Sequence, residues 1–168
     1  MDKAITKFLK DRHSKGYLNF SGLFGIIKYY GIKVYDIGIQ GAAGFSDGTC
    51  VYLDLQKLVR INDEQCFFII AHELSHQIRF NRKEPNYTFN IYKNHTFEEY
   101  VELGIFEELF ADKLACLIYF RLNGTTFDMK RDVETIRRNI ESTRPIYNMI
   151  KSNNLTYPEI VKYFTYSR

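Results

Sequence analysis

The stretch Phe67-Phe68-Ile69-Ile70-Ala71-His72-Glu73-Leu74-Ser75-His76-Gln77-Ile78 decides the fold and carries the strongest functional signal of the chain. Its large apolar residues recur at helical spacing and form one face: Phe67, Ile70, Leu74 and Ile78. His72 and His76 lie one helical turn apart and point nearly the opposite way, so both imidazoles can reach one metal ion. Glu73 projects from the flank of that second face, where it can act as a general base. The pattern is typical of zinc metallopeptidases.

This motif needs a third ligand, because catalytic zinc sites usually have three protein ligands and one open position. No further histidine follows within a few residues of His76, which excludes the extended three-histidine motif. The two remaining histidines, His13 and His95, show no ligand spacing.

The better candidates lie in the run Phe106–Asp112. Glu108 and Asp112 are one turn apart on the same helical face, among large apolar residues, and buried carboxylates are costly unless paired or bound to metal. We therefore expect Glu108 to be the third ligand. Asp112 then accepts a hydrogen bond from the free ring nitrogen of a ligating histidine. Glu107, one position away, stays open as an alternative ligand.

Composition and charge limit the other function classes. The net charge of +3 is spread along the chain, so no nucleic-acid-binding face is expected. Three cysteines without Cys-x-x-Cys spacing argue against a disulfide framework and favour a reducing compartment: Cys50, Cys66 and Cys116. We find no signal peptide and no segment of membrane-spanning length, so a cytoplasmic protein without a membrane partner is expected.

The 168 residues predict one domain of α+β class, mostly helical, with a small antiparallel or mixed sheet packed against the motif helix. Its expected parts are N-terminal helices (1–30), a core (31–125) and a C-terminal helical extension (126–168). Helices are expected at about 3–14, 19–30, 64–80, 96–122, 128–142 and from about 156, where Thr156 begins a capping box. Strands are expected at 33–39 and 49–54, joined by a glycine-rich connection, and a long connection spans 81–95.

The sequence from Ala71 to His76, followed by Glu108-Leu-Phe-Ala-Asp112-Lys-Leu-Ala115, resembles the ImmA/IrrE-type metallopeptidases of bacteria and their mobile elements. The resemblance covers roughly residues 20–122. It departs at Ser75, where the family usually has glycine, and at Leu114, where it usually has phenylalanine.

This resemblance implies a minimal zincin-like, gluzincin-type domain. It implies His72, His76 and Glu108 as ligands of Zn²⁺ (with Mn²⁺ possible), Glu73 as general base and Asp112 as the partner of a ligand. It further implies a cytoplasmic endopeptidase of narrow specificity that cleaves a helix-turn-helix repressor of a phage or mobile element, an anti-repressor protease.

The sequence leaves open an alternative function, the position of the substrate and the oxyanion-stabilising residue. A catalytically silent zincin-fold regulatory module that acts by protein binding is the main alternative, against which the intact Glu73 argues. Zincins commonly bind substrate along a sheet edge, expected here at 43–46 or 49–54. An oxyanion-stabilising side chain is expected among four residues near in sequence: Tyr87, Tyr92, His95 and Tyr100.

Overall fold

A computed structural model of the protein describes residues 2–47, 49–80, 92–129 and 131–168. It is mostly helical with two small sheets, which confirms the α+β class. The helices are α1 (Lys3–Lys15), α2 (Phe20–Tyr30), α3 (Leu55–Leu58), α4 (Asp63–Phe80), α6 (Phe97–Asn123), α7 (Val133–Glu141), α8 (Arg144–Asn153) and α9 (Tyr157–Phe164). The strands are β1 (Val34–Asp36), β2 (Gly38–Ile39), β3 (Gly44–Ser46), β4 (Val51–Leu53) and β5 (Thr165–Tyr166).

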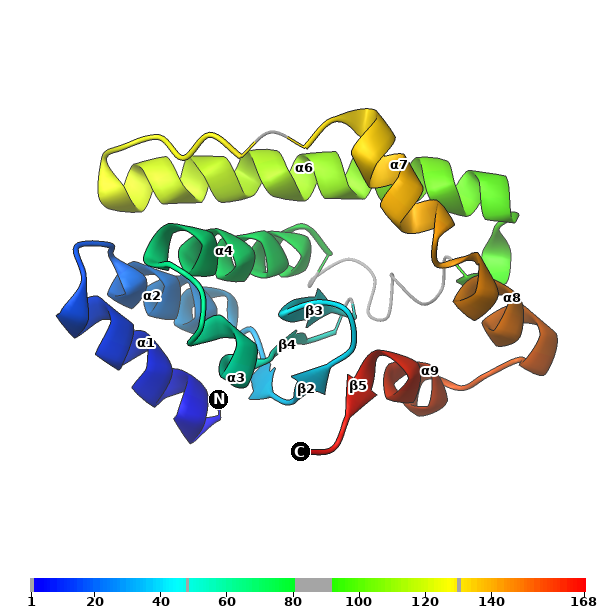
Figure 1. Ribbon diagram of the computed structural model, residues 1–168, viewed down its shortest axis with the longest axis horizontal. Helices are drawn as coiled ribbons and strands as arrows, with labels where there is room; N and C mark the ends of the chain where they lie inside the picture. Colours follow the sequence, from blue (N-terminus) through cyan, green and yellow to red (C-terminus); the bar gives the residue numbers. More distant parts are fainter. Residues whose placement is uncertain (1, 48, 81–91, 130) are drawn as a thin grey trace.

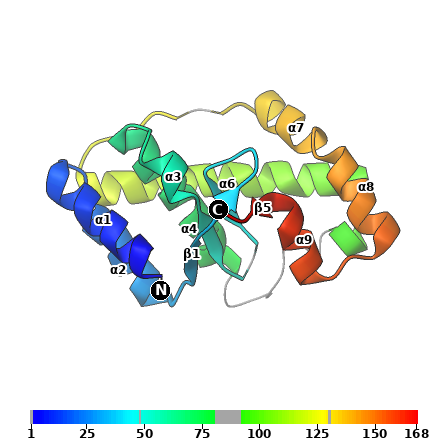
Figure 2. The ribbon, with the colours of Figure 1, turned by 60° about the horizontal axis from the view of Figure 1, so that its bottom comes forward.

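The motif helix α4 lies at the centre of this arrangement. Figure 1 shows the long helix α6 running above α4, and α4 also contacts α2, β3 and β4. Helices α7, α8 and α9 lie towards the N-terminal end of α6 and bring the chain back to β5 at the middle of the molecule (Figure 2). No helix in the described ranges combines the length and apolar character needed to cross a lipid bilayer.

Helix ends follow the local signals in the sequence. The side chain of Asn19 accepts a hydrogen bond from the Gly22 N–H (2.9 Å), and that of Asn62 accepts one from Gln65 (2.9 Å). These contacts satisfy N–H groups that have no partner inside the helix. Capping boxes begin α6 at Thr96 and α9 at Thr156, so the predicted start of the last helix is confirmed.

The three-stranded sheet has the order β1-β4-β3, with β1 parallel and β3 antiparallel to β4. It is therefore mixed, one of the two expected forms. The strand predicted at 33–39 is two short strands, β1 and β2, and β2 pairs with β5 instead of joining the larger sheet. The alternative sheet edge at 49–54 was wrong, because β4 is the central strand, whereas β3 (Gly44–Ser46) is an edge strand.

The C-terminal helices differ from expectation. The helix predicted over 128–142 begins only at Val133, because Asp132 caps it by accepting a hydrogen bond from Thr135 (2.7 Å). Helix α8 lies between the helices expected at 128–142 and from about 156, where the sequence predicts none. Proline is tolerated in the first turn of a helix, where its missing N–H would have no partner anyway, and Pro145 lies there.

Two apolar clusters form the core. The first contains α1, α2, the sheet, α4 and the C-terminal half of α6, and includes Phe67, Ile70 and Leu74. The second contains the N-terminal half of α6 with α7, α8 and α9. The expected buried ridge of α4 is confirmed for those three residues, while Ile78 is half-buried. Helix α6 belongs to both clusters and connects them.

Candidate metal centre

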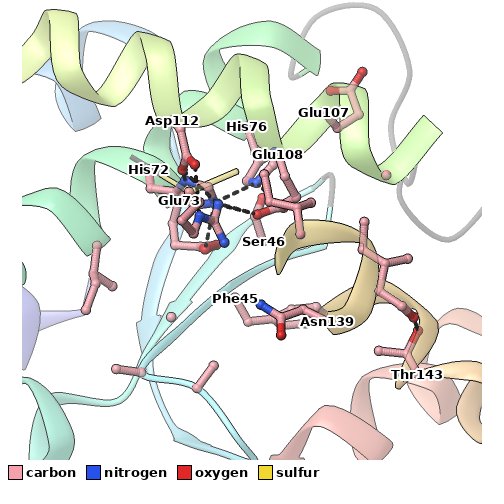
Figure 3. Close-up of a pocket in the computed structure, with 18 of the residues that line it drawn as sticks. Phe45, Ser46, His72, Glu73, His76, Glu107, Glu108, Asp112, Asn139 and Thr143 are labelled. Carbon is pink, nitrogen blue, oxygen red and sulfur yellow. Dashed lines mark hydrogen bonds and ion pairs between the residues drawn. The ribbon is translucent and has the colours of Figure 1, made fainter. Parts of the chain in front are cut away.

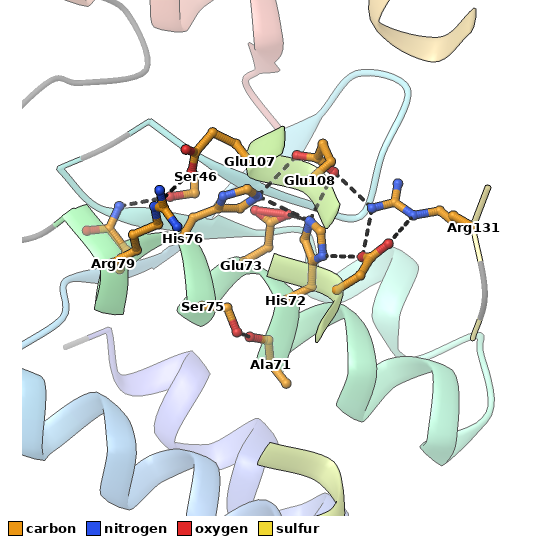
Figure 4. A network of polar contacts seen from close by, with 12 residues as sticks. Ser46, Ala71, His72, Glu73, Ser75, His76, Arg79, Glu107, Glu108 and Arg131 are labelled. Carbon is orange, nitrogen blue, oxygen red and sulfur yellow. Dashed lines mark hydrogen bonds and ion pairs between the residues drawn. The ribbon is translucent and has the colours of Figure 1, made fainter. Parts of the chain in front are cut away.

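Helices α4 and α6 bring the predicted ligands together. Packing of Phe67, Ile70 and Leu74 into the first cluster turns the other face of α4 towards α6. On that face His72 is buried and His76 is half-buried. Glu108 projects from the middle of α6 to meet both rings (Figure 4).

The three donor groups form a compact triangle. The Nε2 atoms of His72 and His76 are 3.2 Å apart. Glu108 places Oε2 3.2 Å from the first nitrogen and Oε1 3.1 Å from the second. Zinc binds nitrogen and oxygen at about 2.0–2.1 Å in a tetrahedron, which requires donors roughly 3.3–3.4 Å apart. The contacts between the three groups, two of which use different oxygens of Glu108, therefore lie near the donor spacing of a small tetrahedral ion.

Glu107 does not share this position. Its carboxylate is buried and lies 3.5 Å from Nε of Arg79, whose guanidinium stacks over the rings of Phe106 and Phe110. Of the two adjacent glutamates, Glu108 therefore contacts the histidines, whereas the side chain of Glu107 points towards Arg79.

Glu73 lies beside the triangle, farther from it than Glu108. Its Oε1 is 3.9 Å from Nε2 of His72, and its ligand atom lies within 4.8 Å of those of both histidines. The group His72, Glu73 and His76 could itself hold an ion, but the shorter Glu108 contacts favour Glu108 as the third donor. Burial raises the pKa of Glu73, as suits a proton acceptor working near neutral pH.

The edge strand β3 makes room for this glutamate. A Cβ atom at Gly44 would lie 2.8 Å from Cγ of Glu73, so only glycine allows the side chain to lie this close to the strand. Ser46 then ties β3 to α4, because its hydroxyl accepts a hydrogen bond from the buried side chain of Gln77 (2.8 Å). The glycine-rich connection of the sequence thus has a specific packing function at this site.

Asp112 occupies the place predicted for it, beside the far ring nitrogen of His72. Its Oδ1 lies 2.8 Å from Nδ1, although the N–H direction is not well aligned for a strict hydrogen bond. A proton held on Nδ1 leaves the Nε2 lone pair free for a metal ion. Burial would lower the pKa of His72, but contacts with Asp112 and Glu108 outweigh it and raise this pKa to about 10. An ion at Nε2 therefore has to displace a proton.

Arg131 completes the network and was missed by the sequence reasoning. Its guanidinium donates to both oxygens of Asp112 (2.9 and 2.8 Å) and to Oε2 of Glu108 (2.9 Å). The segment 128–142 was expected to be one amphipathic helix, and nothing in that pattern marked Arg131 as a site residue. In the sequence, the only sign of a nearby cation was the pair of carboxylates of Glu108 and Asp112, one helical turn apart.

A cavity of about 510 Å³ opens in front of the triangle. Figure 3 shows it bounded by β3, α4, α6 and α7. Tyr92 and Tyr100 line it, which leaves them as the oxyanion candidates in the cavity. Tyr87 lies outside the described residues, and the ring of His95 faces Glu99 (3.7 Å) instead.

Comparisons with protein-family models, with curated proteins and with solved structures find no match for this chain.

Proposed function

We propose that this protein is a metal-dependent endopeptidase. The observation that carries the proposal is the triangle of donor groups from His72, His76 and Glu108, whose nearest contacts are 3.1–3.2 Å long, beside the buried carboxylate of Glu73. Zn²⁺ fits the donor set and its spacing best, and Mn²⁺ is the second choice.

Each residue then has a defined task. When bound, the ion supplies Lewis acidity for a water molecule and for the scissile carbonyl. Glu73 accepts a proton from the attacking water and delivers it to the leaving amine. Asp112 holds the ring of His72 in one orientation, and Arg131 holds the carboxylates of Asp112 and Glu108.

The edge strand β3 offers a surface for an extended peptide. The Asp54 N–H donates to the Ala43 carbonyl (2.9 Å) and the Asp47 N–H donates to the Cys50 carbonyl (3.2 Å). Since backbone groups alternate in direction along an antiparallel strand, those of Gly44 and Ser46 point away from β4. A substrate can therefore add as a further strand beside the cavity.

For the substrate we propose a helix-turn-helix repressor of a phage or mobile element, cleaved in the cytoplasm. This part rests on the sequence resemblance that the segments 71–76 and 108–115 carry. The repressor encoded beside the gene of this protein is the first substrate to test.

The first experiment combines metal analysis with cleavage. Purified protein should hold about one transition-metal ion per chain and cut that repressor at one position. Glu73→Gln should keep the metal and abolish cleavage, because the amide cannot accept the proton. Unaltered cleavage by Glu73→Gln would refute the assignment of the base.

A matched pair of variants tests the third ligand. Glu108→Ala should lose most of the metal affinity, whereas Glu107→Ala should keep it, since that carboxylate pairs with Arg79. The opposite result would move the ligand by one residue. Metal binding without cleavage of any candidate repressor, in wild type and variants alike, would instead support the regulatory module that acts by binding.

A further inference from the structure

The cavity extends beyond the donor triangle into the space between α6 and α7. We name the walls of this part the α6–α7 subsite: Tyr100, Gly104, Ile136, Asn139, Ile140 and Thr143. Gly104 precedes Glu108 by one helical turn, which corresponds to about 6 Å along the axis of α6. That distance suits the side chain of a peptide residue whose backbone lies at the donor triangle.

The walls of the subsite are mainly apolar. Ile136 is 1% exposed and belongs to the second core cluster, and Ile140 packs against that cluster from α7. Gly104 has no side chain, and a Cβ there would lie 2.8 Å from Cδ1 of Ile140. Glycine inside a helix costs about 1 kcal/mol relative to alanine, so its presence here matches the close approach of α7.

The two hydroxyl groups of the subsite already have partners in the protein. The Tyr100 hydroxyl lies 3.1 Å from the Thr143 hydroxyl and 3.2 Å from that of Tyr92. Thr143 also donates to the Ile140 carbonyl (2.6 Å). Glu107, one turn along α6 from Gly104, pairs with Arg79. A ligand group in this space therefore meets mainly apolar surface, with the Asn139 amide and the Glu107 carboxylate as the nearby polar groups and no cation on the walls named above.

We propose that the α6–α7 subsite binds a large aliphatic or aromatic side chain of the peptide substrate, next to the scissile bond. This inference rests on the proposed peptidase function and adds the class of residue that the enzyme selects. Ile136 and Ile140 are its specificity-determining residues. An acidic side chain is rejected because it would lose its hydration without gaining a cationic partner on these walls.

The test uses hydroxamates of N-acetylated leucine, alanine and aspartate, which attach to zinc through the hydroxamate and differ only in the side chain. Titration calorimetry on the zinc-loaded protein should show at least tenfold tighter binding of the leucine compound than of the alanine compound. The aspartate compound should bind most weakly. Equal affinities for the three would overturn the subsite, whereas failure of all three to bind would count against the metal centre itself.

Variants on α7 locate the effect. Ile140→Glu should weaken the leucine compound at least tenfold and make the matching lysine compound the preferred one. Val133→Glu is the control: it places the same charge on the same helix, at a residue 42% exposed and outside the cavity lining. If Ile140→Glu fails to fold, the milder Ile140→Ala takes its place. It should reduce the preference for the leucine compound over the alanine compound.

A second measurement is independent of the metal. In the metal-free protein, N-acetyl-leucine amide at millimolar concentration should shift the NMR signals of the Ile136 and Ile140 methyl groups. N-acetyl-aspartate amide at the same concentration should leave them unchanged. The absence of any shift with the leucine amide, or equal shifts with both compounds, would overturn the proposal whatever the hydroxamates show.

Discussion

Replacing Asp112 by asparagine tests whether this residue supports the metal centre. In the wild type, Oδ1 lies 2.8 Å from Nδ1 of His72 and accepts a hydrogen bond from Nη2 of Arg131 (2.8 Å), while Oδ2 accepts from Nε (2.9 Å). Asparagine keeps the shape but has only one oxygen. Whichever way its amide turns, the NH₂ group faces a donor of His72 or Arg131.

The expected size of the effect follows from this geometry. Loss of a carboxylate partner of a ligating histidine costs about 10–100-fold in metal affinity, or roughly 1.4–2.7 kcal/mol. The upper half of that range is expected here, because one substitution weakens both the contact with His72 and the bidentate pair with Arg131.

Competition with a chromophoric zinc chelator measures the affinity directly. Glu102→Gln serves as the matched control, because Glu102 also pairs from α6 with an arginine, Arg137, but lies on the exposed surface away from the histidines. A dissociation constant within twofold of the wild type for Asp112→Asn would refute the reasoning. So would an equal loss in Glu102→Gln, and thermal melting of the metal-free proteins checks that both variants fold.

Three further predictions concern stability and thiol chemistry. Leu74→Ala should lower the free energy of unfolding by about 2–5 kcal/mol in denaturant titrations, because Leu74 is fully buried in the first cluster; a loss below 1 kcal/mol would contradict that. Thr96→Ala should cost about 1 kcal/mol in the same assay, through loss of the α6 capping box. Burial raises the pKa of Cys50 and Cys66 to about 12. At pH 8 a thiol reagent should therefore label Cys116 first in the native protein, and the other two cysteines only after unfolding. Early labelling of Cys66 would contradict its buried position.

Local sequence signals predicted much of the fold. The capping box at Thr156 predicted the start of the last helix, because its two partners lie within three residues of each other. The strand β5 could not be found this way. It has two residues, and its partner β2 lies near the other end of the chain, so no local pattern marks it.

The candidate site shows the same division. Helical spacing placed His72 with His76 and Glu108 with Asp112, because residues four apart share a face in any α-helix. Glu108 was preferred to Glu107 as the third ligand because Asp112, four residues later, lies on the same helical face as Glu108. The contacts of Arg131 could not be predicted from the sequence. Arg131 reaches the two carboxylates from the segment before α7, and the sequence pattern placed that segment inside a helix.

The position of α6 in both apolar clusters has a consequence for the order of folding. The fully buried residues of the first cluster and both donor helices come before Gly124, so they can assemble while the later part of the chain is still being synthesised. The wall formed by α7 and the pairing of β5 with β2 can follow only afterwards. Under the proposed function, a nascent chain would bring the donor residues together before the pocket for the peptide exists, so the immature protein would not cut its neighbours.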